Sequence, residues 1–474
     1  MSPEEFRRYG KQVVDWIADY LSTIESYPVG ARTRPGEVRA ALPAHPPEQG
    51  EPYEKVLEDV SRVIMPGITH WQHPSFFAFF PSNASGPAIL GDLLSSGLGV
   101  QGLVWAASPA STELETVVVD WLAELLGLPA RFRTDSTGGG VIQDSASSSA
   151  LVALLAALHR TSGGEIRAGG ITRRYTLYVS SQTHSALEKA ARITGIGADN
   201  VRVVDVDPLT LAMDPGHLRS LVTEDIAAGA VPAMVCATVG TTSTTAIDPV
   251  AAIGPVCAEH GIWLHIDAAY AGVAAICPEL RWINDGVAEY ADSYATNPHK
   301  WLLTNFDCGV LWVADREAVT GALSIMPEFL RNQASDSGEV IDYRDWQVPL
   351  GRRFRALKLW SVIRWYGAEG LRQHLRTMVS LGDEFAALVS ADPDFEVRPH
   401  HPFGLVCFRP LWTDEETMAL LERLNDSGEL YLSHTRVAGR VFLRMAIGAP
   451  SVTSDHIAKA WATIRRISRD MRPA

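Results

Sequence analysis

The alternation of short apolar runs with helical segments constrains the fold of this chain more than any other feature. The runs, between about residues 175 and 315, are YTLYVSS, NVRVVDVD, PAMVCATVG, GIWLHIDAA, SYATN and CGVLWVAD, and helical patterns separate most of them. Short, nearly all-apolar runs rich in β-branched residues indicate parallel strands that are covered on both faces. The sequence therefore predicts an α/β fold with a mainly parallel central sheet.

The chain is too long, at 474 residues, to fold around a single core. An amphipathic helix is predicted near residues 5–25, and a Pro- and Gly-rich stretch separates it from a second helix. We expect an N-terminal helical arm over 1–85, a large domain over 86–378 and a small C-terminal α/β domain over 379–474. The arm has little core of its own, so it must pack on the main body or on another subunit.

Composition and charge exclude several classes of protein. The formal net charge of −14 argues against a nucleic-acid partner and against an anionic membrane surface. No apolar signal-peptide core opens the chain, and no run of about eighteen apolar residues occurs in it. The five cysteines lie in apolar context without metal-like spacing, which indicates reduced thiols, a cytoplasmic protein and no metal site.

One lysine lies in unusually apolar sequence. Lys300 precedes Trp301, Leu302 and Leu303 in the stretch NPHKWLLTNFDCG. Burying an unpaired ammonium group is costly, so one reading is a side chain that reaches from a strand end to water. The other reading is a desolvated lysine that attacks a carbonyl carbon and forms a Schiff base. This window by itself leaves both readings open.

Polar residues that follow the predicted strands are the next candidates, because ligands of open parallel sheets bind beyond the carboxyl ends of the strands. Asp267 follows GIWLHI, where a carboxylate either caps the next helix or pairs with a cation or a donor. The small residues that follow it, in DAAYAG, leave room for a flat ligand. Lys300 lies about one strand-helix-strand unit downstream, so the two residues are expected to be neighbours.

Two further segments add to this set. Glycines 138–140 with Ser145, Ala146 and Ser147 precede a predicted helix and could bind phosphate, although such a loop is more often only a capped turn. His184 opens a helix, where it is either a capping residue or a ring that stacks on a ligand. An amine, an acid, an anion site and a stacking ring together match pyridoxal 5′-phosphate.

Longer stretches around these residues resemble those of a known family. The matching stretches run in order over nearly the whole chain: HWQHPSFFAFFPSNAS, VWAASPASTELETVVVDWL, GGGVIQDSAS, THSALEKA, HIDAAYAG, NPHKWLLTNFDCG and DYRDWQVPLGRRFRALKLW. They are similar to the aromatic L-amino acid decarboxylases, the group II pyridoxal-phosphate-dependent decarboxylases of fold type I. The resemblance implies a homodimer in which the arm embraces the partner and each active site takes residues from both subunits.

The resemblance also assigns roles residue by residue. It implies that Lys300 forms the Schiff base with pyridoxal 5′-phosphate, that Asp267 pairs with the pyridine nitrogen and that His184 stacks on the ring. Residues implied around the phosphate, the cofactor or the substrate carboxylate are Ala146, Ser147, Ser293, Asn297, Thr242, Ala269 and His299. Residues implied in the aromatic substrate pocket are Trp71, Phe80, Pro81, Ser82 and Leu103.

Some positions tune or depart from the family pattern. Gly351 lies where the family tunes substrate size, and glycine there is similar to members that accept catechol or indole rings. Leu103 replaces a residue that is often aromatic. Ser148 stands where an acidic residue is frequent, and Asp144 stands where glycine is frequent.

The implied activity is decarboxylation of aromatic L-amino acids, of the tryptophan, tyrosine, phenylalanine or DOPA type, to arylalkylamines. In the family a loop tyrosine protonates the substrate carbon, but the matching segment 323–340 carries Phe329, which has no proton to give. The aldehyde-synthase branch has phenylalanine there and couples decarboxylation to oxygen-dependent oxidative deamination. We place simple decarboxylation first, because another acid or water can supply the proton, and the synthase second.

A third hypothesis is a non-catalytic relative that binds the cofactor for structure or regulation. The joint presence of Lys300, Asp267 and His184 argues against it, because losing any of them would be the sign of an inactive enzyme.

Overall fold

The computed structural model describes residues 1–325, 334, 339–399 and 402–472. The chain divides into two compact units. The large unit comprises Ser82–Gly382 and Arg398–Val406, and the small unit comprises Met1–Pro81, Asp383–Val397 and Cys407–Ala474. The domain boundaries expected at residues 85 and 378 stay a prediction.

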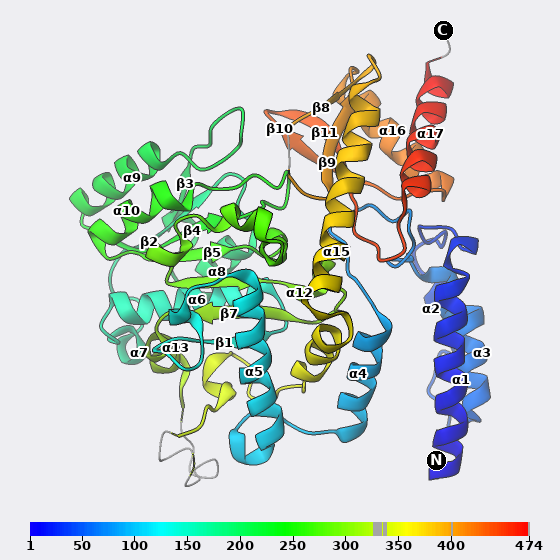
Figure 1. The fold of residues 1–474 in the computed structure, drawn as a ribbon, viewed down its shortest axis with the longest axis horizontal. Helices are drawn as coiled ribbons and strands as arrows, with labels where there is room; N and C mark the ends of the chain where they lie inside the picture. Colours follow the sequence, from blue (N-terminus) through cyan, green and yellow to red (C-terminus); the bar gives the residue numbers. More distant parts are fainter. Residues whose placement is uncertain (326–333, 335–338, 400–401, 473–474) are drawn as a thin grey trace. The chain divides into compact units, whose positions relative to one another are not determined.

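The large unit contains the predicted central sheet (Figure 1). Within the described residues it has seven strands in the order β1-β7-β6-β5-β4-β2-β3. β2 to β6 run parallel, whereas β7 runs antiparallel to both β6 and β1. The strands are β1 (Gly139–Gln143), β2 (Tyr175–Ser180), β3 (Val201–Val204), β4 (Val231–Thr238), β5 (Trp263–Asp267), β6 (Ser293–Thr296) and β7 (Gly309–Val313). The mainly parallel sheet is therefore confirmed.

Helices cover both faces of this sheet. α6 and α8 pack on one face together with α13, and α9 and α10 pack on the other (Figure 1). The helices of this unit are α4 (Gly86–Leu98), α5 (Pro109–Leu126), α6 (Ala146–Thr161), α7 (Ile166–Gly169), α8 (Ala186–Thr194), α9 (Pro215–Ala227), α10 (Val250–His260), α11 (Val287–Tyr290), α12 (Pro298–Trp301) and α13 (Arg316–Leu323). α15 (Ala356–Ser390) begins in this unit and is interrupted at Gly367, whose φ is 62°.

The core of the large unit explains why its strands read as unbroken apolar runs. Every residue of β2, β5 and β7 is buried, because side chains on both sides of the sheet meet a helix layer. α6 is rich in small and branched apolar residues, including Val152, Leu154 and Ala156, which are fully buried against the sheet. Burial of this surface is the main source of stability for such a layered fold.

Strand β1 was not expected, because its glycines read as a loop. The glycines instead allow β1 to pack closely inside the sheet. A Cβ on Gly140 would lie 2.7 Å from the ring of Trp312, and one on Gly138 would clash with the carbonyl oxygens of Arg131 and Val313. The prediction that glycines 138–140 help to bind phosphate is therefore wrong, and the loop that remains for this role begins after β1, at residue 144.

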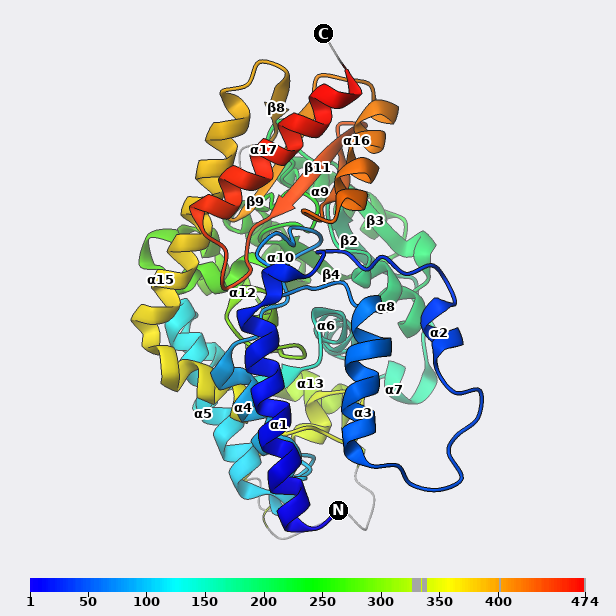
Figure 2. The same ribbon diagram turned by 90° about the vertical axis from the view of Figure 1, so that its right-hand side faces the viewer.

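The small unit contains the N-terminal helices and an antiparallel sheet. Helix α1 lies beside α3 (Figure 2), and the two are joined by a Tyr9–Tyr53 ring contact at 5.1 Å. α1 buries only Tyr9, so it has little core of its own, as expected. The elements are α1 (Pro3–Ser22), α2 (Glu37–Ala41), α3 (Tyr53–Asp59), β8 (Phe395–Val397), β9 (Leu405–Pro410), α16 (Asp414–Ser427), β10 (Ser433–Val437), β11 (Arg440–Ala446) and α17 (Ser454–Met471).

Two features are absent from the described part of the chain. None of its helices is long and apolar enough to cross a membrane. No group of three or more His, Cys, Asp or Glu side chains in it could hold a metal ion. The five cysteines are all buried, and none of them forms a disulfide within the described residues.

Candidate active site

The candidate site lies at one edge of the large-unit sheet, where the parallel strands end. Asp267 is the last residue of β5 and pairs in register with Ala295 of β6, so the segment after β6 begins beside it. Because β7 is reversed, its first residue, Gly309, lies at the same edge, opposite Gln143 at the end of β1. Residues that follow or precede these strands are thereby brought together: Asp144–Ser147, His184, Thr242, Asp267–Ala269, Asn297–Lys300 and Asp307–Gly309.

Asp267 is held in a defined orientation by its own loop. The side chain is 7% exposed, and its Oδ1 accepts a hydrogen bond from the backbone N–H of Ala269 at 3.1 Å. Buried carboxylates are stable only where donors or cations surround them. The charge of Asp267 opposes the lowering of the His184 pKa.

His184 is exposed and stands just before α8. Its ring Nδ1 accepts the backbone N–H of Ala186 at 3.1 Å, so the proton of the neutral ring is on Nε2. Partial desolvation lowers the pKa of the ring; the charge of Asp267 opposes this change, and the charge of Lys300 adds to it. His184, Asp267 and Lys300 therefore form one electrostatic group.

Lys300 lies on the short helix α12, directly after a strand end. Its backbone N–H donates to the carbonyl of Asn297 at 3.0 Å, and the residue is half-buried. The preceding residue, His299, is 6% exposed, and its Nδ1 accepts the backbone N–H of Cys308 at 2.9 Å. Burial lowers the pKa of His299 to about 3, and the charge of Lys300 contributes to this shift.

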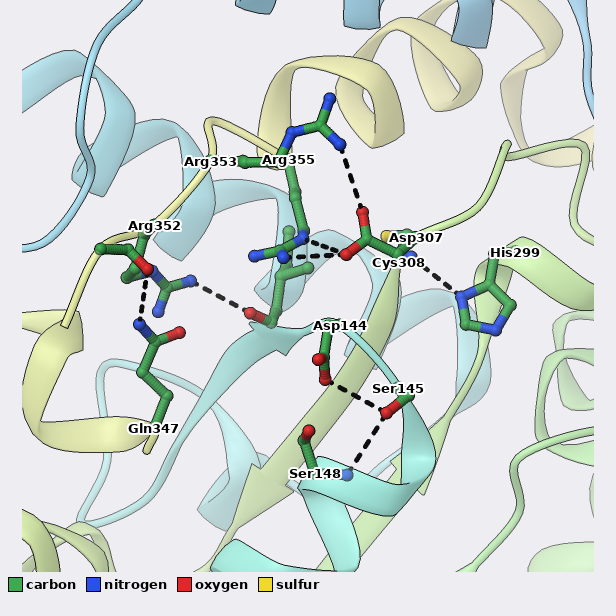
Figure 3. Close-up of polar contacts among 12 residues, drawn as sticks. Asp144, Ser145, Ser148, His299, Asp307, Cys308, Gln347, Arg352, Arg353 and Arg355 are labelled. Carbon is green, nitrogen blue, oxygen red and sulfur yellow. Dashed lines mark hydrogen bonds and ion pairs between the residues drawn. The ribbon is translucent and has the colours of Figure 1, made fainter. Parts of the chain in front are cut away.

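The start of α6 provides the anion-binding end of the site (Figure 3). Ser145 caps the helix, accepting from the Ser148 N–H at 3.4 Å and donating to Asp144 at 3.1 Å. The N–H groups of Ala146 and Ser147 belong to the first turn, so the helix itself offers them no acceptor. A helix of this length also directs its positive dipole end toward this point.

A buried amide completes the anion site. Asn297 is 3% exposed, and its Oδ1 has no hydrogen-bond partner among the described residues. A Cβ on Gly309 would lie 2.8 Å from that atom and 3.2 Å from the backbone carbon of Ser145, so the three residues enclose one small space. Because a side-chain amide can present either its oxygen or its NH₂ group, Asn297 can donate to an anion placed there. The amine, acid, ring and anion site together fit pyridoxal 5′-phosphate.

Comparisons with known proteins agree with this geometry. Residues 35–410 match the family described as "Pyridoxal-dependent decarboxylase conserved domain". The chain is 49% identical to phenylacetaldehyde synthase of Arabidopsis thaliana over 98% of this chain and 96% of that protein. It is 46% identical to aromatic-L-amino-acid decarboxylase of Mus musculus over 98% and 97% of the two chains. The chain belongs to the aromatic amino acid decarboxylase family.

A solved structure supports the fold of this decarboxylase-family protein. The crystal structure of Oryza sativa TDC with PLP and tryptamine matches it with a TM-score of 0.96 at 43% identity, covering 99% of each chain. The expected fold type I architecture is thus confirmed, and the cofactor of the family is pyridoxal 5′-phosphate. In this decarboxylase-family chain Lys300, Asp267 and His184 would hold the cofactor ring, and Ala146, Ser147 and Asn297 would hold its phosphate.

Ser293 was predicted to contact the cofactor phosphate, but it lies apart from Ala146, Ser147 and Asn297. It is the first residue of β6, at the opposite end of the strand from the site. Its hydroxyl is fully buried and hydrogen-bonded to Trp263 Nε1 and to His265 Nδ1, both at 2.8 Å. Ser293 therefore tethers β5 to β6 and is separated from the anion site by the length of the strand.

The two remaining cofactor residues lie at the expected edge. Thr242 is half-buried in the loop after β4. Ala269 is buried, and its carbonyl accepts the backbone N–H of Asn297 at 3.1 Å. This bond joins the loop after β5 to the segment that carries Lys300, which fixes the spacing between Asp267 and the lysine.

The predicted substrate-pocket residues of the decarboxylase-family chain divide between the units. In the small unit Trp71 stacks on Phe79 with ring centroids 5.5 Å apart, and Phe80 and Pro81 are buried. In the large unit Ser82 is half-buried, and the segments that carry Leu103 and Gly351 are paired through the Gly102 N–H and the Arg352 carbonyl at 3.2 Å. Phe329 lies outside the described residues.

Sequence reasoning missed a charged cluster beside this site (Figure 3). Asp307 accepts from Arg355 Nε at 3.1 Å and from Nη2 at 2.8 Å. Lys358 is fully buried, with Nζ 3.5 Å from Asp92 and 3.9 Å from Asp307. A search for polar residues before a strand, as well as after one, would have found Asp307 in NFDCG.

Proposed function

We propose that the protein decarboxylates aromatic L-amino acids to arylalkylamines, with pyridoxal 5′-phosphate held by Lys300. The observation that carries this proposal is the grouping of Lys300, Asp267 and His184 beside the anion site at the start of α6. When bound, the cofactor supplies an electron sink for the pair released with carbon dioxide. The net reaction consumes one proton and converts the amino acid into the amine and carbon dioxide.

The residues of this chain perform the remaining tasks. The Asp267 carboxylate would keep a proton on the ring nitrogen, where its fixed negative charge stabilises the developing charge. The N–H groups of Ala146 and Ser147 would anchor the phosphate. His184 would cover one ring face and exclude water. Lys300 would yield its place to the substrate amine and return when the product leaves.

Two observations support an aromatic substrate: the names of the relatives, and the absence of a side chain at Gly351. The names of the relatives reported above refer to aromatic amino acids or to products derived from them. Gly351 is exposed, and a Cβ there would meet only Gln101 Oε1, at 3.4 Å. The absence of a side chain leaves space at this position, which favours a bulky ring such as indole.

A second candidate function is aromatic acetaldehyde synthesis. Phe329 occupies the place where the family has a tyrosine proton donor, and the chain is 49% identical to a phenylacetaldehyde synthase. In this reaction one amino acid, one dioxygen and one water yield the aldehyde, carbon dioxide, ammonia and hydrogen peroxide. Dioxygen is the electron acceptor and is reduced to peroxide, while the carbon that bears the amine is oxidised.

One paired assay separates the two candidates. Purified holoenzyme is given tryptophan, tyrosine, phenylalanine and 3,4-dihydroxyphenylalanine separately, and carbon dioxide release and oxygen uptake are followed together. Amine and carbon dioxide without oxygen uptake would establish simple decarboxylation. Equimolar oxygen uptake with aldehyde and peroxide would establish the synthase. No carbon dioxide from any of the four would contradict the aromatic substrate class.

We further propose a homodimer whose active sites take residues from both subunits. α1 exposes Phe6 and Val14, and α4 exposes Leu90, Leu93, Leu94 and Leu98 on one face. Apolar faces of this kind are typical of surfaces that another subunit covers. Light scattering of the full chain at increasing concentration tests the dimer, and a monomer with full activity would contradict it.

A further inference from the structure

A carboxylate lies directly beside the anion site at the start of α6. Asp144 follows Gln143, the last residue of β1, and precedes Ser145, which caps α6. Asp144 is half-buried, and Figure 3 shows its carboxylate turned toward Ser145. A negative charge at this point opposes the binding of an anion, because like charges repel more strongly where water is partly excluded. The site that would hold a phosphate therefore already contains a negative charge.

The Ser145 hydroxyl makes two hydrogen bonds. Its oxygen accepts the Ser148 N–H at 3.4 Å, and its own proton is donated to Asp144 Oδ1 at 3.1 Å. A serine hydroxyl has only one proton to donate. While Asp144 accepts that proton, Ser145 cannot donate it to a phosphate oxygen. Asp144 therefore removes one donor from the anion site and also adds a charge to it.

The neighbouring cations make their contacts with other carboxylates. The charges of Asp307 and Asp144 help to raise the pKa of Arg355. The Arg355 guanidinium nevertheless binds Asp307, through Nε at 3.1 Å and Nη2 at 2.8 Å. Lys358 Nζ lies 3.5 Å from Asp92 and 3.9 Å from Asp307. Among the described residues Asp144 thus has no ion pair of its own that would cancel its charge.

We propose that Asp144 sets the affinity of the anion site: it holds the Ser145 proton and repels the phosphate, so this chain binds pyridoxal 5′-phosphate more weakly than it would without the Asp144 carboxylate. This inference rests on the proposed function, which places the phosphate at the start of α6. The consequence is a cofactor that dissociates readily. The loaded fraction of the protein would then follow the concentration of free cofactor.

A carboxylate beside a capping serine has an alternative role that concerns the helix alone. Asp144 could hold Ser145 in the orientation that receives the Ser148 N–H, and a negative charge near a helix start is favourable. In that role the loss of Asp144 would weaken α6 and would not strengthen cofactor binding. The two roles predict different changes in cofactor affinity, so measuring that affinity separates them.

The first test removes the charge in two ways. Asp144→Asn keeps the shape of the side chain, whereas Asp144→Ala also removes its polar atoms. Pyridoxal 5′-phosphate is titrated into each apoenzyme and followed by absorbance, and thermal unfolding reports stability. We expect both variants to bind the cofactor about 10-fold more tightly than the unsubstituted protein. Equal or weaker binding in both would overturn the inference.

Asp135→Asn is the matched control for this test. Asp135 is an exposed carboxylate of the same unit, and it pairs with Arg133 at 3.3 Å. Its removal changes the net charge of the protein by the same amount as Asp144→Asn. We expect unchanged cofactor affinity in Asp135→Asn. A gain equal to that of Asp144→Asn would assign the effect to net charge and would overturn the inference.

The second test asks whether the phosphate is the group that Asp144 repels. Pyridoxal has the same ring and aldehyde as the cofactor but no phosphate. We expect Asp144→Ala to bind pyridoxal as the unsubstituted protein does, and to bind pyridoxal 5′-phosphate and inorganic phosphate more tightly. Equal gains for pyridoxal and its phosphate would overturn the inference. If pyridoxal 5′-phosphate bound to no form of the protein, the proposed function would fail with it.

The third test follows the Ser145 proton. In the unsubstituted protein Asp144 holds this proton, so Ser145→Ala should change cofactor affinity by less than about 2-fold. In an Asp144→Ala background the hydroxyl is released, and Ser145→Ala should weaken binding by about 5-fold or more. The lost helix cap is common to both backgrounds and cancels in the comparison. Equal effects of Ser145→Ala in the two backgrounds would show that Asp144 does not control the Ser145 donor.

Discussion

The two histidines beside Lys300 share a hydrogen-bonding pattern but differ in burial. His184 and His299 each accept a backbone N–H at Nδ1, from Ala186 and Cys308 respectively. His184 is exposed, whereas His299 is 6% exposed and has a pKa of about 3. The same tautomer is thus found in an exposed ring, His184, and in a buried ring, His299. Local hydrogen bonds therefore select the tautomer, whereas burial decides whether the ring can accept a further proton.

Removing the Lys300 amine, which neighbours both histidines, is expected to have the largest effect on kcat. Lys300→Ala loses the amine that would hold the cofactor, so kcat should fall by about 10³-fold or more. The Lys300 charge lowers the pKa of both histidines, so both pKa values should rise in this variant. Turnover assays and ¹⁵N NMR check the two expectations. A variant with near-normal turnover would refute the central role of Lys300.

The exposed histidine is expected to act mainly through its ring face. His184→Leu should weaken cofactor binding and lower kcat by about 10²-fold. His184→Phe keeps an aromatic surface, so cofactor affinity should recover while kcat stays low. Cofactor titration monitored by absorbance, together with initial rates, separates the two effects. Equal cofactor affinities in His184→Leu and His184→Phe would show that His184 does not act by stacking on the cofactor ring.

The anion site offers a smaller, steric test near the buried histidine. Gly309→Ala places a methyl group 2.8 Å from Asn297 Oδ1, so cofactor affinity should fall by about 10-fold and stability by about 1–3 kcal/mol. Gly169→Ala is the control, since a Cβ there meets nothing within 4 Å and the residue lies on neither the site nor the proposed dimer surface. Apoenzyme titration and thermal unfolding measure both quantities. Unchanged cofactor affinity in Gly309→Ala would exclude this space as the phosphate site.

The smallest expected effect concerns stability as a function of pH. Burial lowers the pKa of His265 to about 4 from an unfolded value of 6.5. The unfolded chain therefore binds this proton first, so stability is fully present above about pH 6.5 and is lost as the pH falls toward about 4. His265→Gln should reduce proton uptake on unfolding in this interval by about one. Denaturant unfolding at several pH values measures how the free energy of unfolding depends on pH. If His265 were not responsible, this dependence would be the same in His265→Gln as in the unsubstituted protein.

Much of this arrangement could be predicted from the sequence. Asp267 and Lys300 were expected at neighbouring strand ends, and the register of β5 with β6 brings those ends together. β1 was missed because its glycines lower strand propensity, and only the contact with Trp312 shows why they are needed. The charged cluster could not be predicted, because it joins Asp307 to Arg355, just before a distant helix, and to Lys358 on that helix.

The tautomer of His299 could not be predicted for a similar reason. It depends on an amide nine residues away, and that amide faces the ring only after α12 and β7 are in place. Residues 326–333, which include Phe329, lie outside the described part of the chain, so the amine-or-aldehyde question still rests on sequence and the paired assay.

The reversed direction of β7 has a chemical consequence. Parallel strands end at the site edge, whereas β7 begins there. Cys308, the residue just before β7, therefore lies at the site, and its N–H contacts the His299 ring at Nδ1. Because a ring nitrogen that accepts a hydrogen bond carries no proton, the ring proton is left on Nε2. The residue that precedes one reversed strand thereby determines which atom of a side chain can donate a hydrogen bond.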